Sequence, residues 1–195
     1  MRGYIPELLS TDAFNTPVPA AKVALIELST AQAAAADDDG LLSGVTLGSS
    51  GAVVKTEFLA NMPYCRNVTI ATTGTAGNVK AGTIVVEGED INGDYLKEEA
   101  EVTADSHVDF TGACAFSKIT KVTFPVMDGA VTAKMGWGNL YGVPFMFSAA
   151  PLALGAVDHV NEAITWTVDD DEIAKNTFTF SSAPAGETVQ VAMFI

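Results

Sequence analysis

Short runs in which apolar and polar residues alternate follow one another along most of the chain from residue 53 onward. Alternation with a period of two residues is typical of β-strands with one buried face. Glycines and an Asn-Gly pair separate the runs, as turns do. The expected strands are Val53–Leu59, Arg66–Thr73, Gly82–Ile91, Asp94–Thr103, Ala115–Pro125, Ala130–Met135, Ala163–Val168, Thr177–Ser181 and Thr188–Ile195. The sequence therefore predicts an all-β fold, an antiparallel β-sandwich or barrel with an extended N-terminal arm.

The clearest local signal is the pair Asn92-Gly93. Asn-Gly favours the two positive φ angles of a type I′ turn, so the expected strands Gly82–Ile91 and Asp94–Thr103 should form a hairpin. In the second of these strands, apolar and charged side chains alternate between the two faces. We therefore expect an antiparallel sheet with one solvated face.

Residues 1–22 contain three prolines and no periodic apolar face. Proline removes a backbone donor and disfavours helix in the residue before it, so this segment should be an extended arm. Large apolar side chains without a face of their own should dock on a surface, either of the same domain or of a neighbouring subunit. We favour the neighbouring subunit. The candidate partner-binding residues of the arm are Tyr4, Ile5, Leu8, Leu9 and Phe14.

The segment that follows the arm is ambiguous. Val23–Leu28 suits either a strand or a helix, and the alanine-rich stretch after it favours a short helix or an ordered loop. Leu41–Ser50 is rich in glycine and serine and should be a loop. We therefore divide the chain into an arm with a connecting segment, residues 1–52, and a β-sandwich or barrel domain, residues 53–195.

The glycine-rich stretch Gly136–Pro144 interrupts the strand pattern and carries two large aromatic residues, Trp137 and Tyr141. We expect a tight loop that packs on the core or on a neighbouring subunit, which makes this pair a possible interface. Aromatic rings of this kind could also stack against a sugar.

Composition and charge limit the classes of partner. With 195 residues, 48% of them hydrophobic, the chain can bury a core. Its net charge of −14, with only 10 Lys and Arg residues, disfavours nucleic acid, because DNA binding depends on neutralising phosphates. The N-terminal residues lack the apolar region of a signal peptide, and no apolar run is long enough to span a bilayer. We expect synthesis in a cytoplasm and no membrane partner.

No arrangement of residues predicts catalysis, a cofactor or a transition metal. The two histidines, His107 and His159, are isolated from each other and from the cysteines. The acidic clusters Asp37–Asp39 and Asp169–Glu172 lack the alternate spacing of a calcium loop and suit solvated turns, although loose Ca²⁺ or Mg²⁺ binding stays open. The two cysteines have no paired spacing and should be reduced, buried thiols. We expect a protein that is not an enzyme.

Four motifs between residues 61 and 145 carry a resemblance to a known class of proteins. They are Pro63–Ile70 (Pro-Tyr-Cys-Arg-Asn-Val-Thr-Ile), Val86–Gly93 (Val-Glu-Gly-Glu-Asp-Ile-Asn-Gly), Ala115–Val122 (Ala-Phe-Ser-Lys-Ile-Thr-Lys-Val) and Gly136–Pro144 (Gly-Trp-Gly-Asn-Leu-Tyr-Gly-Val-Pro). In this order they resemble virion structural proteins of tailed bacteriophages, in particular capsid decoration or cement proteins, also called head auxiliary proteins. Cys65 stands where proteins of this kind have proline.

The resemblance implies a structural role and supplies no catalytic residues. It implies a protein on the capsid exterior that binds the major capsid protein and copies of itself, as a homo-oligomer that we expect to be a trimer. It would brace contacts between capsomers, with no nucleic acid bound. The alternatives are a phage tail tube, baseplate or fibre-base protein, and a carbohydrate-binding β-sandwich with Trp137 and Tyr141 as its platform.

Overall fold

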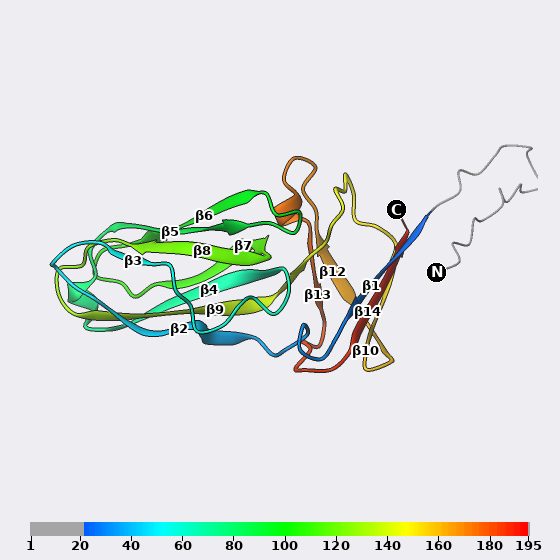
Figure 1. Cartoon of the computed structure of the whole chain (residues 1–195), viewed down its shortest axis with the longest axis horizontal. Helices are drawn as coiled ribbons and strands as arrows, with labels where there is room; N and C mark the ends of the chain where they lie inside the picture. Colours follow the sequence, from blue (N-terminus) through cyan, green and yellow to red (C-terminus); the bar gives the residue numbers. More distant parts are fainter. Residues whose placement is uncertain (1–21, 195) are drawn as a thin grey trace, which may run out of the picture.

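A computed structural model describes residues 22–194, and these residues form an all-β fold, as predicted (Figure 1). The strands are β1 (Val23–Leu28), β2 (Asp37–Leu47), β3 (Val53–Lys55), β4 (Arg66–Gly74), β5 (Gly82–Glu89), β6 (Tyr95–Val102), β7 (Asp109–Phe116), β8 (Lys118–Phe124), β9 (Val131–Gly142), β10 (Ala153–Val157), β11 (Val160–Glu162), β12 (Ile164–Thr167), β13 (Thr177–Phe180) and β14 (Val189–Phe194). Two short 3-10 turns, Ala76–Asn78 and Ile173–Lys175, interrupt them. No helix within residues 22–194 has the length and apolar character needed to cross a membrane.

Two antiparallel sheets face each other and form a sandwich. One has the order β12-β13-β9-β4-β7, with β2 also paired to β9, and the other has the order β3-β8-β5-β6. Apolar side chains from both sheets fill the space between them, here called the sandwich core. Val68, Ile84, Val122, Phe124 and Met135 are among its fully buried members. The alternation seen in the sequence thus places one face of each strand against the opposite sheet.

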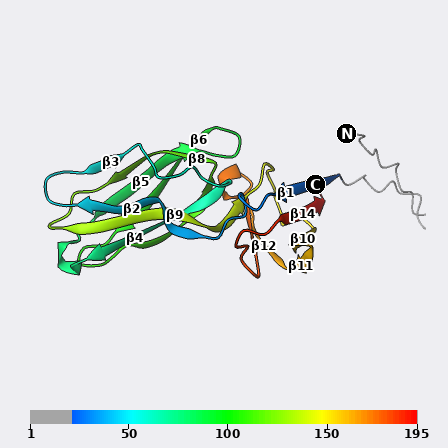
Figure 2. The ribbon, with the colours of Figure 1, turned by 60° about the horizontal axis from the view of Figure 1, so that its bottom comes forward.

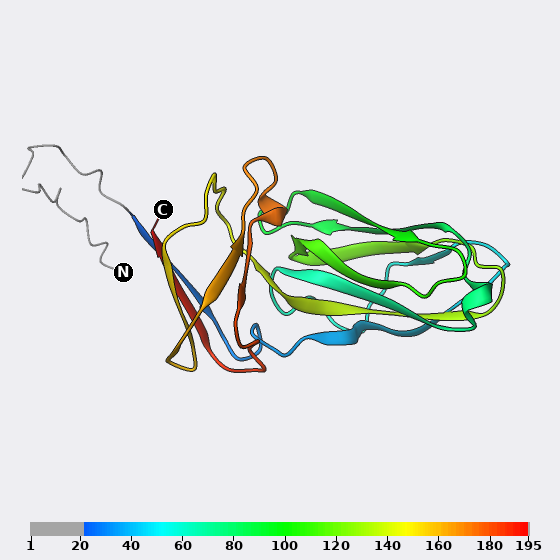
Figure 3. The same cartoon turned by 180° about the vertical axis from the view of Figure 1, so that it is seen from behind.

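A third sheet covers one end of this sandwich (Figures 1 and 3). This small sheet has the order β1-β14-β10-β11, and its inner face packs on β12, β13 and the last residues of β9. The space between them is a second core, here called the end core, and it is rich in aromatic rings. The Tyr141 ring stacks on Phe178 at 5.4 Å between centroids, and Phe178 meets Phe180 edge to face at 5.5 Å. Figure 2 shows the small sheet from a second direction, still beyond the end of the sandwich.

Strand β9 connects the two cores, and this corrects the prediction of a loop at Gly136–Pro144. The strand continues to Gly142 instead of ending at Met135. Gly136 lies where the carbonyl oxygen of Asp37 would overlap any Cβ atom, and at Gly142 a Cβ would lie 2.7 Å from the Cys65 sulfur. These glycines therefore permit close contact between neighbouring segments, which the sequence pattern does not distinguish from a turn.

Residues 23–47, assigned from sequence to the segment before the β domain, contribute two strands to the sheets. Val23–Leu28 is a strand, which settles that ambiguity, and the expected loop Leu41–Ser50 mostly belongs to β2. Strand β2 pairs with β9 through two register shifts, so its glycine and serine residues sit in an irregular strand. The alanine-rich stretch forms a single turn, with Ala33 N–H donating to the Ser29 carbonyl at 2.9 Å, and no α-helix.

Several other predicted boundaries are wrong. The expected strand Ala115–Pro125 is divided at Ser117 between β7 and β8, and Val53–Leu59 is a strand only as far as Lys55. Strands β10 and β11 were not predicted. The predicted hairpin of β5 and β6 is confirmed, but its turn is not type I′. Within this turn only Gly93 has a positive φ. The Asp90 N–H donates to the Asp94 carbonyl at 2.9 Å, so the connection comprises the three residues 91–93.

Candidate interaction surface

The outward face of the small sheet is apolar, although its inward face already fills the end core. On β14, Val189, Val191 and Met193 point inward and are fully buried, and the residues between them point outward. On β1, Ile26 and Leu28 are buried, whereas Val23 and Leu25 are 62% and 58% exposed. A strand with apolar residues on both faces normally has both faces covered.

The register places the outward side chains in rows across the sheet. Leu25 lies opposite Ala192, which lies opposite Leu154 on the next strand. Val23 lies opposite Phe194, whose N–H donates to the Leu152 carbonyl at 3.0 Å. We call this outward set the apolar face; its large members are Val23, Leu25, Leu152, Leu154 and Phe194.

The next row along the same sheet is polar and marks the border of the apolar face. Glu27 lies opposite Gln190, and the Gln190 amide donates to the Glu27 carboxylate at 3.0 Å. Asn161 on β11 lies opposite Ala156 in the same row. The apolar face is therefore confined to the end of the sheet where β1 begins.

The exposed fractions within the apolar face are large. Leu152 and Leu154 are 73% and 72% exposed, and Phe194 is 45% exposed. Burying a large apolar side chain is worth roughly 1.5–3 kcal/mol, so leaving several together in water forgoes a substantial free energy. Single exposed apolar residues are ordinary, but a contiguous group on one sheet face marks an interaction site.

A shallow groove of about 470 Å³ continues from the apolar face toward β12. Its apolar lining includes Leu152, Leu154, Ile164 and Trp166. Asn161 and Glu162 add polar groups to the lining. An extended peptide segment that covered the apolar face could continue along this groove.

Neither of the two aromatic residues predicted to lie in an interface loop is in a surface loop. Trp137 is 9% exposed in the sandwich core, where its indole N–H donates to the Ala35 carbonyl at 2.9 Å. Tyr141 is fully buried in the end core. They therefore form neither an interface loop nor a sugar-stacking platform. The predicted arm residues, Tyr4, Ile5, Leu8, Leu9 and Phe14, lie outside the described residues.

A buried arginine lies beside Tyr141. Arg66 is fully buried and donates to the carbonyls of Gly138 at 2.7 Å and Ala34 at 2.6 Å, and to the Asn139 amide oxygen at 2.9 Å. Within residues 22–194 no carboxylate pairs with it. Burial lowers the pKa of the Arg66 guanidinium and raises the pKa of the Tyr141 hydroxyl. These contacts link β4 to β9 and to the segment that precedes β2. The sequence analysis did not predict them.

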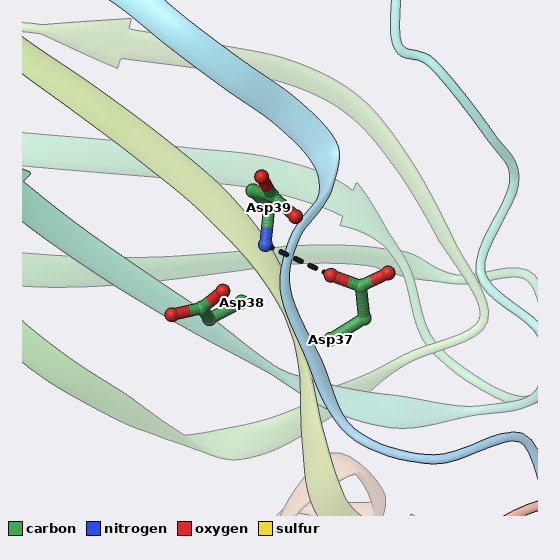
Figure 4. A group of neighbouring side chains, drawn as sticks. All are labelled: Asp37, Asp38 and Asp39. Atoms are coloured by element: carbon green, nitrogen blue, oxygen red, sulfur yellow. Dashed lines mark hydrogen bonds between the residues drawn. The ribbon is translucent and has the colours of Figure 1, made fainter.

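The carboxylates of Asp37, Asp38 and Asp39 lie within 4.8 Å of one another at the start of β2 (Figure 4). Asp37 accepts a hydrogen bond from the Asp39 backbone N–H at 3.1 Å, and Lys134 forms an ion pair with Asp38. A hydrogen bond with the Asp37 side chain raises the pKa of the Asp39 carboxyl. The cluster is largely exposed and Lys134 offsets part of its charge, so we assign no ligand to it.

The remaining candidate groups have structural positions. Asp169 accepts hydrogen bonds from the N–H groups of Asp171 at 2.9 Å and Glu172 at 2.8 Å, which lower the pKa of its carboxyl. Both cysteines are buried and unbonded to each other. Burial raises the pKa of the Cys65 and Cys114 thiols to about 12. Thiols with such pKa values are protonated and inert at neutral pH.

Comparison of the chain with protein-family models, curated proteins and solved structures gives no match. The candidate site therefore rests on the chain's own residues. Sequence reasoning missed the apolar face because β10 was not predicted and β1 was ambiguous. A usable signal was present, since Val23–Leu28 has apolar residues at five of its six positions, as a strand covered on both faces does.

Proposed function

We propose that the chain is a structural protein of a tailed-phage virion that binds the outer surface of the capsid and stabilises contacts between capsomers. The observation that carries a binding role is the apolar face of the small sheet, a surface that stays exposed after both cores are filled. The choice of the capsid as partner rests on the resemblance of the motifs between residues 61 and 145.

The charge of the chain favours the exterior of a shell. With 24 acidic and 10 basic residues, the protein repels packaged DNA and would not compete for phosphates. On the sandwich, the outward residues of β6 include Lys97, Glu99 and Glu101, which keep that face solvated. The polar sandwich would therefore point toward solvent, and the apolar end would make protein contacts.

Stabilisation would follow from mass action. A protein that binds only the assembled shell stabilises it by RT ln(1 + [L]/Kd) at each site, which is about 2.7 kcal/mol when its free concentration is 100 times Kd. Repeated sites on a symmetric shell add avidity, because linked contacts are lost only together. Catalysis has no part in this mechanism.

Electron microscopy of mixtures tests this proposal. Purified protein is added to empty capsids and, separately, to tail tubes of a tailed phage that encodes the chain, and each mixture is sedimented and imaged in negative stain. Saturable, regularly spaced density on the capsids supports the proposal. Binding to the tubes and not to the capsids would replace it with the tail assignment, and binding to neither would overturn both.

A further inference from the structure

We propose that the apolar face is the docking surface for the N-terminal segment, residues 1–21, of a second copy of this chain. The inference concerns how copies of the chain associate with each other and does not depend on the capsid as partner. It rests on the position of the apolar face, on the composition of the segment next to it, and on the path that the prolines of this segment favour.

The N-terminal segment joins the fold at the apolar face. The described chain begins at Lys22, and the next residue, Val23, is itself a member of the apolar face. Val23 lies in the row of Phe194 and Leu152, at the apolar end of the small sheet. Any segment that precedes Lys22 therefore starts beside the surface that needs cover.

The composition of the segment is complementary to the apolar face. Over residues 1–21 it carries seven large apolar side chains, two of them aromatic, against two acidic and one basic residue. The apolar face has no charged member, and its polar border row holds the single carboxylate of Glu27. Contact between the two would bury apolar surface on both sides without burying an unpaired charge.

The backbone of the small sheet offers a second kind of contact. In the part of the chain that the structure describes, β1 pairs only with β14, so the other edge of β1 keeps its N–H and C=O groups unpaired. An extended segment can add to such an edge and supply backbone hydrogen bonds, while alternate side chains reach the neighbouring face. Proline within the segment limits this pairing to part of its length.

The prolines favour a neighbour's face over the chain's own. Thr16-Pro17-Val18-Pro19 holds two residues that precede proline, and such residues avoid the helical region and stay extended. A segment that covered its own apolar face would have to reverse direction between residues 16 and 22. If the chain is extended there, as these prolines favour, residues 4–14 would lie up to about 25–60 Å from Lys22, at about 3.3 Å per residue. That distance reaches another copy, and repeated exchange can close a cyclic oligomer.

Disulfide trapping between chains that each carry one introduced cysteine tests the inference directly. One chain carries Leu8→Cys and an isotope-labelled second chain carries Leu154→Cys; the two are expressed separately, mixed, unfolded in urea and refolded together, oxidised mildly and resolved by mass. The native thiols Cys65 and Cys114 are buried, so they do not compete. We expect the mixed disulfide to exceed, by roughly tenfold or more, that formed when Val54→Cys replaces Leu154→Cys, because docking raises the effective concentration of the thiols. Val54 is a matched control, 54% exposed but on β3 of the sandwich.

Three other outcomes would contradict the proposal, the first of them in a further variant. A single chain that carries both substitutions and closes only an internal disulfide would show docking on its own face and overturn the proposal. Disulfides between two Leu154→Cys chains as the main product would show face-to-face contact and also overturn it. A mixed disulfide no more abundant than the Val54→Cys control would mean that the segment does not dock there.

Measurements of mass in solution give an independent readout. Deleting residues 1–16, or replacing Leu25 and Leu154 with serine, should each convert the oligomer to a folded monomer in light scattering. Leu25 and Leu154 lie outside the two cores, so the serine substitutions should preserve folding. Retention of the oligomer by the truncated chain would contradict the inference.

Discussion

The guanidinium carbon of Arg66 lies 4.8 Å from the centre of the Tyr141 ring, and the two residues are also register partners of β4 and β9. Tyr141 belongs to the end core, whereas Trp137, four residues earlier on β9, belongs to the sandwich core. Arg66 donates to groups of Gly138 and Asn139, which lie between them. This side chain therefore holds the part of β9 that passes from one core to the other.

Replacing Arg66 with methionine should lower the free energy of unfolding by roughly 2–5 kcal/mol. Methionine keeps much of the volume but leaves the carbonyls of Gly138 and Ala34 without donors, and each such buried group costs about 1–3 kcal/mol. Urea unfolding measures the change. Lys80→Met is the control, because Lys80 and Asp128 form an exposed ion pair worth no more than about 1 kcal/mol. Equal stability of the two variants would contradict a role for Arg66 in linking β4 to β9.

Gly136→Ala should destabilise the pairing of β2 with β9. An added methyl group would overlap the Asp37 carbonyl oxygen, and the backbone would have to move apart at a cost of roughly 1–3 kcal/mol. Thermal unfolding should show a lower midpoint. Gly48→Ala is the matched control, since no atom lies within 4 Å of the position of its Cβ. If both variants unfold at the same temperature as the unmodified protein, the close approach of Asp37 to Gly136 is wrong.

Glu98 should make stability depend on pH. Its carboxylate accepts hydrogen bonds from Ala113 at 2.7 Å and Cys114 at 3.1 Å, but burial is the larger effect and raises the pKa of this carboxyl. The folded state then holds the proton more tightly than the unfolded state. The contribution of Glu98 to the free energy of unfolding therefore falls as pH rises through the window between the two pKa values and is constant above it.

Glu98→Gln removes this titration. The variant should gain stability relative to the unmodified protein over the pH range that begins at the usual pKa of a glutamate carboxyl and extends above it, because burial raises the pKa of Glu98 in the folded state. Urea unfolding at several pH values measures the difference. The same substitution at Glu101, an exposed residue of the same strand, is the control. A difference for Glu98→Gln that is constant across this range would refute the assignment.

The sequence predicts strands well where one face is buried and the other solvated, as in β5 and β6, because the alternation itself is visible. The prediction fails where tertiary contacts decide whether a segment forms a strand or a turn. The glycines of β9 resemble turn residues, but Gly136 is required by a neighbouring backbone that only the folded chain brings near. Strand β2 contains glycine and serine and is held by pairing with β9. The apolar face forms only because β1, β14 and β10 pair in this register, and no local sequence pattern specifies that register.

The heat stability of the shell tests the proposed function most directly. Empty, expanded capsids are heated with increasing concentrations of the purified protein, and the temperature at which the shells break is measured by light scattering. The account predicts that this temperature rises with the logarithm of the free protein concentration once that concentration exceeds Kd, as binding to the assembled state alone requires. A breakage temperature that stays constant while the protein saturates the capsids would contradict a stabilising role.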